Sequence, residues 1–197
     1  MQAWVMARGS GGYDRLVAAR KRALLSNLHG LVVEIGPGTG PNLPYFAPDV
    51  RWTGLEPNLH MHPYLRKEAA RLGREIEIRS VGAPHLDFDD NSVDAVVSTL
   101  VLCSVPNLPR TLAEILRVLK PGGRLVFIEH VAAPRGTLGR ALQEIVEPVW
   151  KVVADGCHPD RETWAAIERA GFSSVRYDRF DMHVPVVGPH IAGVAVK

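Results

Sequence analysis

The chain has 197 residues, which is enough for one domain with a proper hydrophobic core. Apolar residues make up 46% of it and charged residues 22%, as in ordinary soluble globular proteins. The 23 basic and 21 acidic residues give a formal net charge of +2, so the bulk charge favours neither a nucleic acid nor a membrane surface as the partner.

Three further features predict a reduced, intracellular protein, and we expect a cytoplasmic one. No stretch of about 18 apolar residues is present, so the sequence predicts no spanning helix. Residues 1–10 lack the apolar core of a secretory signal. The spacing of Cys103 and Cys157 from nearby histidines does not indicate a metal cluster, and no metal site is expected.

The first predicted element is a helix over residues 13–28, where apolar residues recur at helical spacing after a flexible segment at 9–12. We interpret its basic residues as a solvated face; they are Arg15, Arg20, Lys21 and Arg22. The apolar stripe can lie over a ligand cleft as a lid, or it can pack into the core. The sequence favours neither arrangement.

A short apolar strand over residues 31–35 then runs into three glycines at alternate positions: Gly36, Gly38 and Gly40. Glycine reaches positive φ at little cost and has no Cβ, so a ligand can lie against the bare backbone. A buried strand that ends in such a loop places the loop at the carboxyl edge of a sheet, where open α/β folds bind ligands.

The residues around this loop indicate the class of ligand. A dinucleotide fingerprint needs glycine or alanine at position 41, where the chain has Pro41. Glu34 lies two residues before the first glycine, and Glu56 ends the next apolar run, near the spacing at which a carboxylate reaches a ribose. Two carboxylates around a glycine loop suit a nucleoside with a cationic tail better than a pyrophosphate.

The remaining pattern alternates strands and helices. Prolines allow only a short, broken helix near 42–46. The other predicted strands cover 52–55, 75–79, 93–98, 124–129, 175–180 and 191–196, and the other helices cover 63–72, 109–119, 137–153 and 161–170. This order predicts one doubly wound α/β domain over residues 1–197, with a mostly parallel sheet and a C-terminal antiparallel hairpin.

The glycine loop resembles motif I of class I S-adenosylmethionine (SAM) methyltransferases, E-x-G-x-G-x-G, and the run VLKPGGRLVFIE at 118–129 resembles their post-motif region. The resemblance implies a Rossmann-like fold with SAM as cofactor. It assigns the cofactor to Glu34, Gly36, Gly38, Glu56, Pro57, Gly82, Ala83, Thr99 and Leu100. In this assignment Glu56 binds the ribose hydroxyls, and Gly82 and Ala83 lie beside the adenine. Glu34 and the backbone of Thr99 and Leu100 receive the amino end, although Glu34 can instead cap nearby amides.

A narrower resemblance covers nearly the whole chain. The pieces LLSNL, TLVLCSV, EHVAAP, DGC and PHIAGVAVK resemble the animal alkyl thiol S-methyltransferases, the methyltransferase-like 7 family. Those proteins carry an amino-terminal membrane anchor, whereas this chain begins almost at the domain, so no anchor is expected here. The resemblance implies methyl transfer from SAM to a small molecule, with the sulfur of an apolar thiol favoured.

A thiolate is already a strong nucleophile, so no strong base is required. His130 and Asp155 are the candidates for helping to remove the thiol proton, although His130 can be a buried structural histidine and Asp155 a turn residue. Cys103 suits a small pocket residue better than a nucleophile. Transfer to the oxygen or carbon of a phenol or quinol is the alternative. A SAM-binding module without catalysis and a nucleotide-dependent oxidoreductase are further alternatives.

Overall fold

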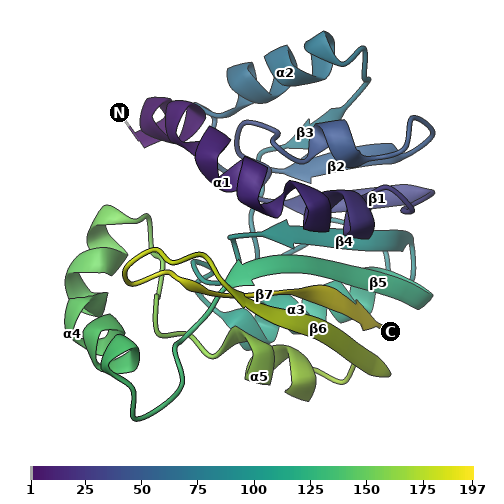
Figure 1. The fold of residues 1–197 in the computed structure, drawn as a ribbon. Helices are drawn as coiled ribbons and strands as arrows, with labels where there is room; N and C mark the ends of the chain where they lie inside the picture. The colour runs from purple at the N-terminus through teal and green to yellow at the C-terminus, as the bar shows by residue number, and fades with distance from the viewer. Residues whose placement is uncertain (1) are drawn as a thin grey trace.

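A seven-stranded sheet forms the centre of the computed structural model, which describes residues 2–197, with side chains from residue 12 onward (Figure 1). The strand order is β3-β2-β1-β4-β5-β7-β6. The strands are β1 (Leu31–Ile35), β2 (Arg51–Leu55), β3 (Glu77–Arg79), β4 (Val93–Thr99), β5 (Leu119–His130), β6 (Ser174–Asp181) and β7 (Pro189–Val196).

The five strands from β3 to β5 are parallel, and β7 runs antiparallel to both β5 and β6. The predicted doubly wound sheet with a C-terminal antiparallel hairpin is therefore confirmed. Because the parallel strands share one direction, the loops after β1, β2, β4 and β5 meet at one edge of the sheet.

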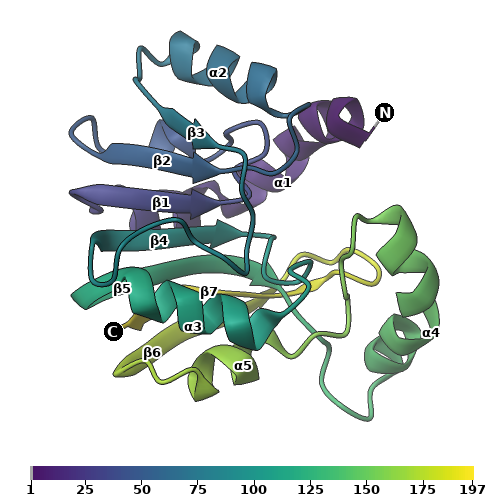
Figure 2. The same ribbon diagram turned by 180° about the vertical axis from the view of Figure 1, so that it is seen from behind.

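Helices cover both faces of the sheet, as Figures 1 and 2 show from opposite sides. One face carries α1 (Gln2–Leu25), the 3-10 turn η1 (Leu43–Tyr45) and α2 (His62–Arg71), and the other carries α3 (Leu108–Val118) and α5 (Thr163–Arg169). The helix α4 (Leu138–Val153) lies beyond the edge of the sheet, beside the turn between β6 and β7. None of the helices in the described part of the chain is both long and apolar enough to cross a membrane.

Alternation along β1 determines what each face buries. Val33 and Ile35 belong to the core beneath α3, whereas Val32 belongs to the core beneath α1 and α2. Glu34 is two residues after Val32, so its side chain points to the same face of the sheet, the one that α1 covers, and is buried there. The strand thus places one acid inside the protein immediately before the glycine loop.

Two expectations about the first helix are wrong. It covers Gln2–Leu25, so the segment at 9–12, expected to be flexible, lies inside α1. Extending a helix that is already packed costs less than nucleating one, which offsets the poor propensity of glycine. The expected solvated face fails for Lys21 alone: Arg15 and Arg22 are exposed, whereas Lys21 is fully buried, with its Nζ 2.6 Å from Asp14 Oδ1. Residues seven apart share one helix face, and this face also buries Val17.

Candidate active site

The glycine loop after β1 combines one glycine that packing requires with one that leaves space. Gly36 has φ +58°, and a Cβ there would lie 2.7 Å from Val101 Cγ2. Gly38 has φ +57°, but no described atom lies within 4 Å of the position of its Cβ. The loop therefore presents bare backbone to open space at Gly38, where a ligand can approach closely.

Glu56, at the end of β2, holds this loop in place. Its Oε2 accepts a hydrogen bond from the Gly38 amide at 2.9 Å, and its Oε1 accepts one from the Asn58 amide at the same distance. Each carboxylate oxygen has a second acceptor site, which can receive a ligand hydroxyl. The Gly82 backbone lies beside Pro57, since a Cβ at Gly82 would be 3.2 Å from Pro57 Cγ. Gly82 and Ala83 thus extend the same site from the loop after β3.

Glu34 acts on the site through Asn42, a residue that the sequence analysis missed. Its two oxygens accept hydrogen bonds from Asn42 Nδ2 at 2.8 Å and from Trp52 Nε1 at 3.1 Å. Asn42 Nδ2 also donates to Thr99 Oγ1 at 3.0 Å, whereas the buried Asn42 Oδ1 has no partner among the described residues. A buried amide oxygen without a donor fits a cationic ligand group. The alternative in which Glu34 caps backbone amides is not what the structure shows.

Leu100 turns the chain just after β4. It has φ +58°, and its amide donates to the carbonyl of Ile128 at 2.9 Å. The next amide, Val101, donates to Glu129 Oε1 at 3.2 Å. Because the Val101 side chain packs on Gly36, this turn links the glycine loop to the end of β5.

Burial raises the pKa of Glu34 from 4.5 to about 7; the Asn42 and Trp52 hydrogen bonds and the charge of Lys21 oppose this shift, and the charge of Glu56 adds to it. A carboxyl group with a raised pKa binds an extra proton in the folded state between pH 4.5 and 7. Raising the pH through this window should therefore lower the free energy of unfolding, by up to about 3 kcal/mol.

Glu34→Gln should remove this dependence. Urea unfolding of wild type and variant, from below pH 4.5 to above pH 7, is the measurement. Glu77→Gln is the control. A hydrogen bond from Arg79 lowers the pKa of the Glu77 carboxyl group, so Glu77 makes the free energy of unfolding rise with pH, and only below pH 4.5. The Glu77→Gln variant should therefore keep the decrease between pH 4.5 and 7 that Glu34 causes. Parallel curves for wild type and Glu34→Gln would contradict the assignment.

A second group of buried polar atoms lies where β5 ends. Glu129 is fully buried, and its Oε1 accepts a hydrogen bond from Ser98 Oγ at 2.7 Å. Its Oε2 and the hydroxyl of Tyr13 on α1 have no hydrogen-bond partner among the described residues. Burial, followed by the charge of Glu129, raises the pKa of Tyr13. Unpartnered polar atoms from two elements in one neighbourhood indicate a place for a ligand.

His130 continues this group toward two cysteines. Its Nε2 lies 3.0 Å from Cys157 Sγ, which also accepts a hydrogen bond from Trp150 Nε1 at 3.3 Å. Cys103 completes the group, since its Sγ, Cys157 Sγ and a ring nitrogen of His130 all lie within 4.8 Å of one another. The expectation that the cysteines form no metal-type cluster is wrong, because the fold joins residues that lie far apart in the sequence.

The two candidates for a base have different surroundings. His130 is buried and contacts Cys157 rather than the backbone, and its Nδ1 has no hydrogen-bond partner in the described part of the chain. Asp155 is exposed, with φ +51°, in the turn that follows α4. The structure therefore brings His130 into the cluster and leaves Asp155 outside it.

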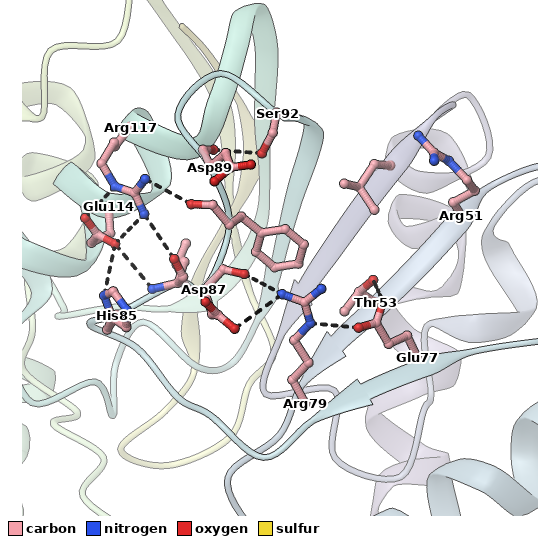
Figure 3. A pocket seen from close by; sticks show the side chains of 13 residues that line it. Arg51, Thr53, Glu77, Arg79, His85, Asp87, Asp89, Ser92, Glu114 and Arg117 are labelled. Carbon is pink, nitrogen blue, oxygen red and sulfur yellow. Dashed lines mark hydrogen bonds and ion pairs between the residues drawn. The ribbon is translucent and has the colours of Figure 1, made fainter.

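A cavity of about 680 Å³ lies elsewhere, and Figure 3 shows its lining. It is bordered by the first residues of β1 and β2, by β3 and by α3, and its lining does not include the glycine loop. The β3–β4 crossover contains no helix, so this part of the sheet is less covered. Several of the charged side chains that line it form ion pairs with one another, as in Arg79–Glu77 and Arg117–Glu114, both at 2.8 Å. We therefore assign the site to the glycine loop and the end of β5.

Comparison with known proteins connects this arrangement to one family. A family model described as a methyltransferase domain matches residues 33–127. Thiol S-methyltransferase TMT1B of Homo sapiens is 42% identical over 198 residues, which cover 93% of this chain and 81% of the relative. TMT1A of Homo sapiens is 39% identical, with coverages of 94% and 81%. Geranyl diphosphate C-methyltransferase from Streptomyces coelicolor A3(2), solved with S-adenosyl-L-homocysteine, shares the fold with a TM-score of 0.71 at 18% identity, covering 92% of this chain and 76% of that one.

Proposed function

The chain belongs to the thiol S-methyltransferase family, and we propose that it transfers the methyl group of SAM to the sulfur of a small, apolar thiol. It is a SAM-dependent methyltransferase, and the identity of the acceptor is the proposal. One geometric observation supports it most directly. The turn at Leu100 and Val101 joins the glycine loop to the buried group at the end of β5, which contains sulfur atoms and polar atoms without a described partner.

The residues around the glycine loop fit SAM. Bound SAM supplies a methyl group on a positively charged sulfur. Glu56 would accept hydrogen bonds from the ribose hydroxyls while it holds the Gly38 amide. Asn42 Oδ1, oriented by Glu34 and Thr99, would accept from the amino group, and the bare backbone at Gly38 would border the methionine part. Pro57, Gly82 and Ala83 would lie against the base.

The acceptor end is apolar with a few buried polar groups. Leu102 is fully buried, Leu100 and Val101 are half-buried, and the indole N–H of Trp150 donates a hydrogen bond to Cys157 Sγ. A free thiol ionises near pH ~8.5, so the protein has to orient the sulfur and exclude water more than it has to supply a strong base. We assign the contact with the acceptor to the group around His130, and no catalytic role to Asp155.

We propose one domain over residues 1–197, in which only part of α1 acts as a lid. Val17 packs against Ile128 and Ala192, and Leu25 belongs to the core beneath α1, so this half of the helix is structural. Tyr13 lies nearer the amino end; its buried hydroxyl has no partner among the described residues, and burial and the charge of Glu129 raise its pKa. The segment around Tyr13 would cover the acceptor end.

The acceptor proposal predicts selectivity for sulfur over oxygen. Each alkyl thiol should be methylated, while the alcohol with the same carbon skeleton is not, and thiophenol should be methylated faster than phenol. The products are followed by mass spectrometry with SAM that carries a deuterated methyl group. A quinol and a phenol in the same panel test the alternative. Methylation of these two without any thioether product would overturn the proposal.

A further inference from the structure

Two cysteine sulfur atoms and one imidazole nitrogen converge where the acceptor would lie. Cys103 follows β4, His130 ends β5 and Cys157 follows α4, and all three side chains are buried. The two sulfur atoms and a ring nitrogen of His130 lie within 4.8 Å of one another. We propose that Cys103, His130 and Cys157 bind one Zn²⁺ ion, whose fourth position receives the sulfur of the acceptor thiol. This inference deepens the proposed function and rests on it for the identity of the fourth ligand.

The donor set suits zinc. Two thiolates and one imidazole are typical ligands of this ion, with Zn–S near ~2.3 Å and Zn–N near ~2.0–2.1 Å. In a tetrahedron with these bond lengths, neighbouring ligand atoms are about 3.5–3.8 Å apart. The observed distance of 3.0 Å between His130 Nε2 and Cys157 Sγ would have to increase slightly. The distances from Cys103 Sγ to the other two ligand atoms are at most 4.8 Å. Small rotations of three side chains therefore complete the site.

Neighbouring groups already support the sulfur atoms. Trp150 Nε1 donates to Cys157 Sγ at 3.3 Å, and Ser104 Oγ lies 3.5 Å from Cys103 Sγ. Arg161 Nη1 donates to the carbonyls of Leu102 and Val105, both at 2.8 Å, and so fixes the loop that carries Cys103. Outer hydrogen bonds of this kind orient metal ligands.

A second group, formed by Glu147, His158 and Asp160, does not share these properties. Its members are half-buried, and two of its three donors are carboxylates. His158 Nδ1 already pairs with Glu147 Oε1 at 2.8 Å. This pairing accounts for the group without a metal, so His158 is a suitable control.

Three protein ligands leave one position open, as in catalytic zinc sites. An acceptor R–SH would lose its proton to solvent as its sulfur binds Zn²⁺. A lone pair of the bound sulfur then forms the new bond to the methyl carbon. The bond between that carbon and the sulfonium sulfur breaks, and its electron pair stays on the sulfonium sulfur, which becomes neutral. The product thioether carries no charge and leaves the metal readily.

The test uses the full chain under reducing conditions. Dialysis against Zn²⁺ should give one bound ion per chain. Replacement by Co²⁺ should give the intense visible bands of a tetrahedral site and a thiolate charge-transfer band. Cys157→Ser and Cys103→Ser should weaken zinc binding by about a hundredfold or more, because even the loss of an outer partner costs about 10–100-fold. His158→Asn should bind zinc as the wild type does.

Addition of an alkyl thiol should change the Co²⁺ spectrum, whereas the matching alcohol should not. Zinc should also protect both cysteines of the wild type from alkylation, a measurement that does not depend on whether a variant folds. Absence of stoichiometric zinc, or a Cys103–Cys157 disulfide in its place, would overturn the proposal. Thiol methylation that persists in a strong chelator would overturn the zinc proposal alone. A zinc-loaded protein that methylates no thiol would instead overturn the proposed function.

Discussion

Gly38→Ala should weaken SAM binding by about tenfold to a hundredfold in a protein that still folds. The new methyl group meets no described atom within 4 Å, so it projects into the space assigned to the methionine part of SAM. Overfilling a packed space by one methyl group costs about 1–3 kcal/mol, which corresponds to this range in Kd. Calorimetric titration with SAM measures the loss.

Strain in the loop must be separated from this effect. Gly38 has φ +57°, where an L-residue costs about 1–2 kcal/mol in stability. Gly122→Ala is the matched control, since Gly122 has φ +77°, has no described atom within 4 Å of its Cβ position, and lies in the irregular stretch of β5 between the paired residues Leu119 and Arg124. It should lose similar stability and keep its SAM affinity. Wild-type affinity in folded Gly38→Ala would show that the ligand does not lie there.

The fold was predictable from the sequence because its signals are local. The apolar run at 31–35 and the glycines after it determine where β1 ends. Gly36, Gly38 and Gly40 all have positive φ, the conformation for which glycine was expected there. Glu56 follows an apolar strand at a spacing that places it beside the same loop. Strand and helix boundaries agree within a few residues, except for α1, whose first half contains glycines, and for β5, which begins at Leu119 rather than at 124.

The parts of the site that were missed depend on packing between distant segments. Asn42 carries no motif of its own, and its role follows from the buried Glu34. Lys21 belongs to a run of basic residues typical of a charged surface, but it pairs with Asp14 inside the protein. Cys157 and His130 are 27 residues apart, so their contact does not follow from the short spacings that are typical of metal-binding motifs. Only the ends of β4 and β5 and the turn after α4, taken together, bring them into one place.

Glu56→Ala should reduce SAM affinity by about a hundredfold or more while the sheet remains folded. The substitution removes the acceptors of the Gly38 and Asn58 amides together with those proposed for the ribose. A hydrogen bond to a charged group contributes about 1.5–3 kcal/mol. Losing the two bonds proposed for the ribose hydroxyls therefore raises Kd by more than a factor of about a hundred. The glycine loop would also lose the contact that holds Gly38, which adds an ordering cost to binding.

Graded variants test this explanation. Glu56→Gln keeps one oxygen acceptor, so its affinity for SAM should lie between those of wild type and Glu56→Ala. Glu75→Ala removes an exposed carboxylate just before β3 and should leave the affinity unchanged. Calorimetric titration gives Kd, and thermal unfolding without ligand shows whether each variant is folded. Folded Glu56→Ala with wild-type affinity would contradict the ribose assignment, whereas equal losses in both Glu56 variants would indicate that charge, rather than the number of acceptors, governs binding.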